Sequence, residues 1–328
     1  MSIMNKKSSF YIFDFEKRAI DNPENFLNKL FERSHEDITN TDKISCYSYS
    51  SFNDPYDANY ILANNIAVFG FREDTKNLSK HRVKKLKDQK MAEWEKSNGG
   101  APQKNEKKEI VAEMMDEVYR ELAVGIRPHE KLTEVLIDFA NGLLYIERKN
   151  LGVALSIVNL FEVDTDGEYP LNSRIFSPFS EDYLENREVE SANSNLFDWL
   201  YKVTNRNASQ NSIEGEDPYL SSKISMREGK STKITITGNV EKYYKIYDSL
   251  DIVDRKIDEV TISKTFPGDE KLTYGLGSKD FGIKGLYFSG SLFHKDEPIS
   301  MALDKANEFK AFKKHLEDLA VEFEKTAA

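Results

Sequence analysis

The sequence predicts an α+β fold of two domains, with mixed or antiparallel sheets and one helical hairpin. Three observations support this prediction. Segments typical of strands and helices follow one another without a regular β-α-β alternation. Two apolar runs flank Asn141-Gly142, the dipeptide most typical of a tight β-hairpin. A break rich in Gly and Pro separates two helical segments within 76–123.

Length and composition are those of a globular chain. The 328 residues can bury a sizeable core, and 39% of them are hydrophobic and 31% charged. Cys46 is the only cysteine, which excludes an internal disulfide and a zinc site built on several cysteines. No apolar run approaches eighteen residues, and the first residues lack the apolar segment of a secretory signal. We therefore predict a cytoplasmic protein with no membrane partner.

The N-terminal part of the chain predicts three strands and one helix. Residues 9–15, 44–50 and 66–72 are rich in aromatic and β-branched side chains, as strands are. After the punctuation at Asn22-Pro23, residues 23–33 place their large apolar side chains on one side, as an amphipathic helix does.

The predicted helical hairpin follows. A Lys-rich helix covers 76–95 and ends at the break 97–102, with the sequence SNGGAP. A second helix covers about 105–123, where apolar residues recur at i, i+3 and i+4. We interpret its two methionines as core residues.

Residues 133–149 predict a β-hairpin. A two-residue turn at Asn141-Gly142 needs positive φ at both positions and places Asp138 opposite Tyr145. One face of the hairpin must then be buried and the other exposed to solvent. The predicted buried face consists of Val135, Ile137, Phe139, Leu144 and Ile146, and the predicted solvent face of Glu134, Leu136, Asp138, Tyr145, Glu147 and Lys149. Residues 151–161 follow as a predicted buried helix, with a strand as the open alternative.

Domain boundaries are predicted from composition. Residues 166–195 form a polar linker or insertion between an N-terminal domain, 1–165, and a C-terminal domain, 196–328. The C-terminal domain is predicted to contain a short helix at 196–203 and a closing amphipathic helix at 299–325. Strand or mixed segments are predicted at 223–226, 230–237, 244–253, 257–266 and 286–288.

Positive charge is concentrated in residues 76–108. This window holds eleven Lys or Arg residues against four acids, a local charge of +7, so the rest of this −10 chain carries −17. A concentrated basic strip can hold phosphate although the remainder of the protein repels it. A Lys-rich helix is, however, often only a solvated face. The predicted DNA-binding residues are Lys80, Arg82, Lys84, Lys85, Lys87 and Lys90, with a supporting cluster of Lys104, Lys107 and Lys108 at the start of the second helix.

Catalytic signatures are nearly absent. The chain has no GxxxxGK[ST] motif, no GxSxG motif and no paired-histidine spacing, so we predict no cofactor, no resident metal and no enzyme activity. One enzymatic alternative stays open, because Asp138, Glu147 and Lys149 form a D…ExK pattern. In metal-dependent nucleases, two carboxylates hold Mg²⁺ while a lysine polarises the attacking water. A third alternative is an interaction protein whose basic helices dock on an acidic partner.

The order of these elements resembles a known family. The basic helix, the Gly/Pro break, the NEKKEIVAEMM helix and the LTEVLIDFANGLLYIER hairpin resemble the recombination-associated protein RdgC, over roughly 66–170. Ile137-Asp138 and Asn141-Gly142-Leu143 match its hairpin, and 196–200, LFDWL, resembles a later helix. The C-terminal third, including 247–253, is similar to RexA, the Rex-type phage-exclusion protein. The N-terminus and the polar stretch 164–195 depart from RdgC.

This resemblance implies a non-enzymatic homodimer that binds double-stranded DNA with little sequence preference. It implies a role in modulating recombination or in phage exclusion and defence, and a location in the cytoplasm at the nucleoid. The basic strip is consistent with this implication. An acidic protein with one basic strip would hold DNA only where the strips of two subunits converge.

Overall fold

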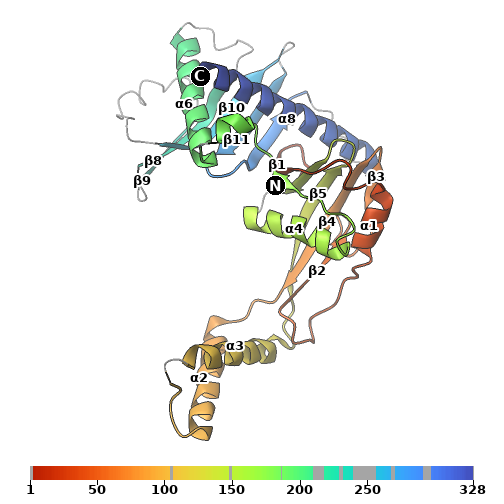
Figure 1. Cartoon of the computed structure of the whole chain (residues 1–328), viewed down its shortest axis with the longest axis vertical. Coiled ribbons are helices and arrows are strands. Elements are labelled where there is room, and N and C mark those ends of the chain that lie inside the picture. The colour runs from red at the N-terminus through yellow and green to blue at the C-terminus, as the bar shows by residue number, and fades with distance from the viewer. Residues whose placement is uncertain are drawn as a thin grey trace. The chain divides into compact units, whose positions relative to one another are not determined.

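The structure is a computed structural model of the whole chain (Figure 1). It describes residues 3–103, 106–147, 150–185, 187–209, 218–228, 232–238, 256–266, 270–290 and 297–327. The predicted strand segment at 244–253, and with it the RexA-like stretch 247–253, lies outside these residues.

The predicted α+β class is confirmed. Within the described residues, one large antiparallel sheet of twelve strands has the order β2-β4-β5-β6-β1-β12-β11-β10-β8-β9, while β3 pairs with β4 and β7 with β1. The strands are β1 (Ser8–Asp14), β2 (Ser45–Ser50), β3 (Ile61–Ala63), β4 (Ile66–Thr75), β5 (His129–Asp138), β6 (Leu143–Glu147), β7 (Arg174–Ile175), β8 (Tyr219–Glu228), β9 (Thr232–Thr237), β10 (Lys256–Thr265), β11 (Lys271–Gly277) and β12 (Ile283–Phe288).

The helices also follow the predicted order. They are α1 (Pro23–Phe31), α2 (Lys80–Ser97), α3 (Lys107–Ala123), α4 (Leu151–Asp164), α5 (Glu181–Leu184), α6 (Val189–Ser209) and α8 (Pro298–Ala327). The segment with helix and strand as open alternatives is therefore helix α4. Strands β3, β7 and β11 match no predicted element, because β3 and β7 have only three and two residues and β11 contains two glycines.

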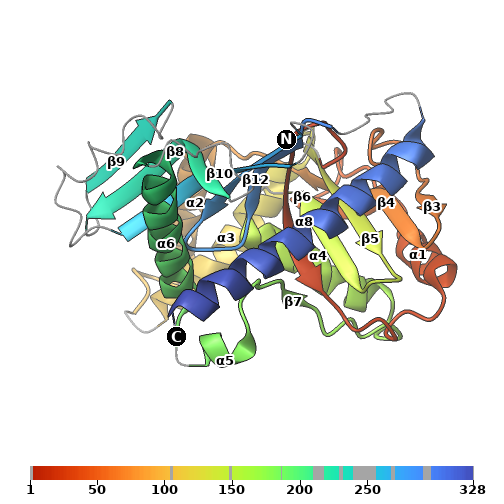
Figure 2. The same cartoon turned by 90° about the horizontal axis from the view of Figure 1, so that it is seen from above.

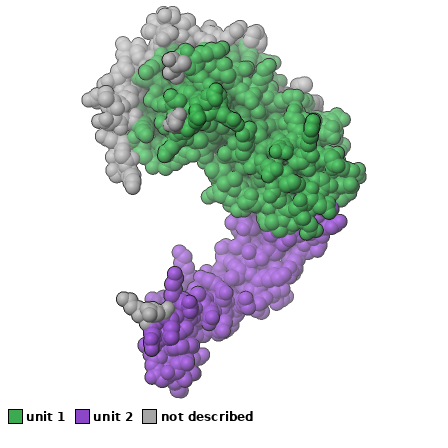
Figure 3. All heavy atoms as spheres, viewed as in Figure 1, with its two compact units in different colours: residues 1–28, 60–69, 133–328 green, residues 29–59, 70–132 purple. Residues whose placement is uncertain are grey.

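The chain divides into two compact units (Figure 3). Unit 1 comprises 1–28, 60–69 and 133–328, and unit 2 comprises 29–59 and 70–132. Strands β4 and β5 each run from one unit into the other along the chain. These units are not the two domains predicted at 1–165 and 196–328, and that division remains a prediction. The polar stretch between them belongs to unit 1, where Tyr169, Leu171 and Phe179 are buried.

The register of the β5–β6 hairpin differs from the prediction. Asp138 pairs with Leu143, so four residues form the loop, and Tyr145 lies opposite Leu136. The cause is the Asp138 carboxylate, which accepts hydrogen bonds from the backbone N–H of Asn141 at 3.0 Å and from its Nδ2 at 2.6 Å. A side chain that bonds the backbone of the turn in this way stabilises a wider loop. Of the two turn residues, Gly142 alone has positive φ, at 65°.

Both faces of this hairpin are buried, so the predicted solvent face was wrong. On one face, Phe139 stacks edge-on against Phe26 of α1, with ring centroids 6.0 Å apart. On the other, Tyr145 lies 4.9 Å from Phe309 of α8. Alternating charged residues had suggested water on that face, but a helix from the far end of the chain covers it.

Helix α8 runs across the sheet of unit 1 (Figure 2). Phe309 contacts Phe10 of β1 at 4.2 Å between ring centroids, and Phe312 contacts Tyr274 of β11 at 4.8 Å. A large aromatic side chain buried in this way contributes about 1.5–3 kcal/mol by removing apolar area from water. The helix thereby joins strands from both ends of the chain into one core.

Two buried tyrosines beneath α8 allow a matched test. The hydroxyl of Tyr145 has no hydrogen-bond partner among the described residues, whereas that of Tyr274 lies 3.0 Å from Nε2 of His315. We expect Tyr145→Phe to leave the free energy of unfolding unchanged or to raise it by about 1 kcal/mol, and Tyr274→Phe to lower it by about 1 kcal/mol. Urea unfolding followed by Trp199 fluorescence, in a chain with Trp94 replaced by Phe, measures both. Equal destabilisation by the two changes would contradict this assignment.

Acid should weaken unit 1 through His315. Burial, and secondarily the charge of Lys264, lower the pKa of His315 from 6.5 to about 4, against the opposing charge of Asp318. Between these pH values the unfolded chain binds the proton and the folded chain does not, so stability falls as pH falls through this window. We expect a loss of up to about 3 kcal/mol between pH 7 and pH 4 that is absent from His315→Gln. Urea titrations of both proteins at pH 7 and pH 4 measure this loss. An equal loss in the two proteins would contradict the prediction.

Candidate nucleic-acid interface

Helix α2 forms because of its local sequence. Six of its eighteen residues are Lys, which favours helix, as do its Leu, Gln, Met, Ala and Glu residues, and it contains neither Gly nor Pro. It ends at Asn98, whose backbone N–H and side-chain Nδ2 both donate to the carbonyl oxygen of Trp94, at 3.0 and 2.9 Å. No residue of α2 is buried. The predicted start at Lys76 was four residues early.

One side of α2 packs on α3, and the cations occupy the rest of its surface. At 100° per residue, Val83, Leu86, Lys90 and Trp94 share one face, and each of them is half-buried. The two helices are in contact within unit 2. Because this seam is narrow, most of the circumference of α2 remains open to solvent.

The first two turns of α2 carry five cations and no acid. Residues 80–87 span about 12 Å and contain Lys80, Arg82, Lys84, Lys85 and Lys87. None of the described residues pairs with the first four, which are exposed; Lys87 is half-exposed, and its Nζ lies 3.9 Å from the Asp88 carboxylate. The N-terminus of a helix already carries partial positive charge, so stability alone would favour acids there. The first turn of α2 contains none.

Lys90, predicted as a DNA contact, is already paired. Its Nζ lies 3.2 Å from the carboxylate of Glu121 and 3.3 Å from that of Glu117, both on α3. These hydrogen bonds, the one to Glu121 first, raise the pKa of Lys90. The ammonium therefore joins α2 to α3, and a phosphate would have to compete with two carboxylates for it; Lys90 as a DNA contact remains a prediction.

Lys76, counted in the basic strip, is buried with 3% of its surface exposed. Its Nζ donates to the carbonyl oxygens of Ala123 at 2.8 Å, Thr41 at 2.9 Å and Thr39 at 3.3 Å. Burial lowers its pKa. A cation at the last carbonyls of α3 is also favoured by the helix dipole. This lysine holds unit 2 together and does not reach the surface strip.

The predicted supporting cluster is separate from these five cations. Lys107 and Lys108 are exposed at the start of α3, about 15 Å along that helix from Glu117. Lys104 lies outside the described residues. On the flank of α2, by contrast, Arg82 and Lys85 line a hollow of about 340 Å³ together with Glu121 of α3.

The D…ExK residues do not come together. Glu147 lies four residues along β6 from the partner of Asp138, a separation of about 13 Å. Asp138 directs both carboxylate oxygens at Asn141, and Glu147 accepts from the backbone N–H of Glu134 at 3.3 Å. Lys149 lies outside the described residues. Two carboxylates so far apart cannot share one Mg²⁺ ion.

One group of potential metal ligands does assemble in unit 2. Ligand atoms of His35, Cys46 and Asp74 lie within 4.8 Å of one another. A cation is already present, because Nε and Nη2 of Arg72 donate to the two oxygens of Asp74 at 2.8 and 2.9 Å. This bidentate pair is almost fully buried, and the Arg72 guanidinium also donates to the carbonyl oxygen of Pro55 at 2.9 Å. The arrangement is a buried ion pair that a divalent ion would have to displace.

No family model matches the chain, and no curated protein matches it. Among the described helices, none is both long and apolar enough to cross a membrane.

The structural role of Lys76 can be tested against an exposed lysine. Lys76→Met keeps the aliphatic stem but leaves three carbonyl oxygens without their donor, so we expect the free energy of unfolding of unit 2 to fall by about 2–4 kcal/mol. Lys84→Met should change it by less than about 0.5 kcal/mol. Trp94 reports on unit 2 when Trp199 is replaced by Phe, and urea unfolding in that background measures both effects. Equal stability of the two variants would show that the hydrogen bonds of Lys76 do not stabilise unit 2.

Proposed function

We propose that the protein binds double-stranded DNA through its phosphates, with little sequence preference, and that it does so as a homodimer. The observation that carries this proposal is the cationic start of α2, where four of the five cations have no ion-pair partner among the described residues and the fifth, Lys87, lies 3.9 Å from the Asp88 carboxylate. Five cations occupy two exposed turns at the helix end where positive charge is least favourable for folding. A bound polyanion would neutralise these charges, for which the described residues supply few counter-charges.

The cations at the start of α2 suit contacts with DNA phosphates, which are the same in every sequence. Lysine is a flexible point charge that meets phosphate oxygens in many geometries, so Lys80, Lys84 and Lys85 suit the uniform backbone of DNA. Arg82 adds a planar fork of donors for the same groups. Lys107 and Lys108 would extend the contact to a second patch.

The charge balance supports the proposed homodimer. Outside 76–108 the chain carries −17, so one subunit presents a short cationic segment on a strongly acidic body. At physiological ionic strength, charges are screened beyond about 8 Å, and only close contacts count. Two segments on one duplex double the number of contacts, and the second binds at high effective concentration. The resemblance to RdgC and RexA supports the same reading, including roles in recombination or phage exclusion at the cytoplasmic nucleoid.

Charge reversal tests the proposal. Replacing Lys80, Lys84 and Lys85 by Glu should weaken duplex binding at least about 100-fold at low salt. The wild-type log–log salt slope should be about −4.5 for five phosphate contacts, and steeper for a dimer. Acids near a helix N-terminus are favourable, so the variant should stay folded. Fluorescence anisotropy with two duplexes of unrelated sequence gives affinity and slope, and light scattering gives the oligomeric state.

The matched control makes the same change in charge on α8. Lys310→Glu, Lys314→Glu and Lys325→Glu alter three exposed lysines of unit 1 and should preserve most of the duplex affinity. Equal loss in both triple variants would show that net charge, and not α2, controls binding. Wild-type protein that ignores duplex DNA at low salt would refute the proposal, and would favour an acidic protein partner for the same cations. Incubation with Mg²⁺ in the same assay should leave the DNA intact; cleavage would restore the nuclease alternative.

A further inference from the structure

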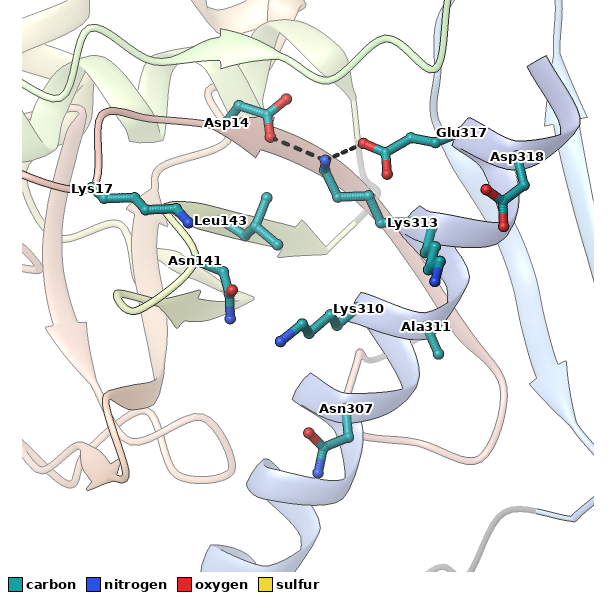
Figure 4. Close-up of a pocket in the computed structure, with 11 residues that line it drawn as sticks. Asp14, Lys17, Asn141, Leu143, Asn307, Lys310, Ala311, Lys313, Glu317 and Asp318 are labelled. Atoms are coloured by element: carbon teal, nitrogen blue, oxygen red, sulfur yellow. Dashed lines mark hydrogen bonds and ion pairs between the residues drawn. The ribbon is translucent and has the colours of Figure 1, made fainter. Parts of the chain in front are cut away.

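A second group of lysines, distant from one another in the sequence, lines a hollow in unit 1 (Figure 4). The hollow measures about 730 Å³ and lies between the outer face of α8, the end of β1 and the β5–β6 loop. The residues that line it include Lys17, Asn141, Asn307, Lys310, Lys314 and Asp318.

The wall opposite α8 consists of the β5–β6 loop and the segment that follows β1, and two local features hold them together. Gly142 has a φ of 65°, and a Cβ at this position would collide with the carbonyl oxygen of Phe15. Its own carbonyl accepts from the backbone N–H of Phe15 at 2.9 Å. This close approach fixes the loop that carries Asn141 against the segment that carries Lys17.

Helix α8 supplies the facing wall from one stripe. Asn307, Lys310, Lys314 and Asp318 are spaced at i, i+3, i+7 and i+11, so they share one face of the helix. The opposite face is fixed on the sheet by Phe309 and the other buried aromatics. The stripe is therefore presented outward on a rigid support.

Charge is unequally distributed in the hollow. Lys313 is neutralised, since its Nζ lies 2.6 Å from the carboxylate of Glu317 and 3.6 Å from that of Asp14. No described residue forms an ion pair with Lys17, Lys310 or Lys314. In Figure 4 the acids Asp14, Glu317 and Asp318 gather at one end, while Lys17 and Lys310 reach into the space from opposite walls.

We propose that this hollow binds a small phosphate monoester of the size of a mononucleotide. Lys17, Lys310 and Lys314 hold the phosphate as point charges. The amides of Asn141 and Asn307 donate to or accept from the polar groups of the uncharged part, and the carboxylates at the other end accept from its hydroxyl and amino groups.

Size and charge select this class of ligand over the alternatives. Pockets for small ligands measure about 300–1,000 Å³, which the hollow matches and free phosphate would not fill. A nucleic-acid strand would bring several phosphates past the carboxylates of Asp14, Glu317 and Asp318, where like charge repels them. A nucleotide meets opposite charge at one end and hydrogen-bond acceptors at the other.

Calorimetric titration of the full chain with AMP, adenosine and inorganic phosphate tests the proposal, with EDTA present. We expect AMP to bind with a Kd below about 1 mM, and adenosine and phosphate each to bind at least about 10-fold more weakly. The double change Lys310→Gln and Lys314→Gln should weaken AMP binding at least about 10-fold, whereas Lys325→Gln, on the same helix but outside the hollow, should not.

Three results would overturn the inference. They are no AMP binding by the wild-type protein, AMP binding unchanged in the double Gln variant, and phosphate binding as tight as AMP binding. The inference stands apart from the proposed DNA binding, because the Glu variant of Lys80, Lys84 and Lys85 should keep AMP affinity. Duplex binding lost specifically in the double Gln variant would instead assign the hollow to nucleic acid and contradict the inference.

Discussion

The packing of α8 across the sheet is the interaction on which unit 1 depends. Phe309 sits against both Phe10 and Tyr145, so one helical residue contacts two neighbouring strands. This burial removes water from the second face of the β5–β6 hairpin, and Asp138 on that face is buried and bonded to Asn141 of its own loop. The same helix presents its outer stripe of Asn307, Lys310 and Lys314 to the hollow. The packing of α8 therefore buries one face of the hairpin and forms one wall of the hollow.

Unit 2 depends on cations that are used in two ways. Arg72 and Lys76 are buried and satisfy carboxylate and carbonyl oxygens, and Lys90 bridges α2 to two acids of α3. These three positive charges stabilise the unit through contacts with its own oxygen atoms. At the start of α2, by contrast, Lys80, Arg82, Lys84 and Lys85 oppose the helix dipole and have no ion-pair partner among the described residues. The division between structural and free cations supports a binding role for α2 better than the total charge does.

The candidate site was partly predictable because its main signal is local. A run of five cations over two helical turns is visible in the sequence, and their exposure follows from the lack of a strong apolar stripe on α2. The pairing of Lys90 could not be predicted, because it requires the packing of α2 on α3. The burial of Lys76 depends on carbonyl groups from two distant segments, near Thr39 and Ala123. The register of the hairpin depended on one side chain, Asp138, whose bond to the turn outweighed the preference of Asn-Gly for a two-residue loop.

The sequence by itself determined the α+β class, the positions of most strands and helices, and the concentration of charge on α2. These properties depend on neighbours a few residues apart, through periodicity, turn residues and helix propensity. Only the tertiary structure decided which faces are buried, which lysines are free, and that Lys17 shares a hollow with Lys310. Those outcomes depend on contacts between residues up to about 300 positions apart, and a single sequence carries no local signal for them because burial is a property of the packed core.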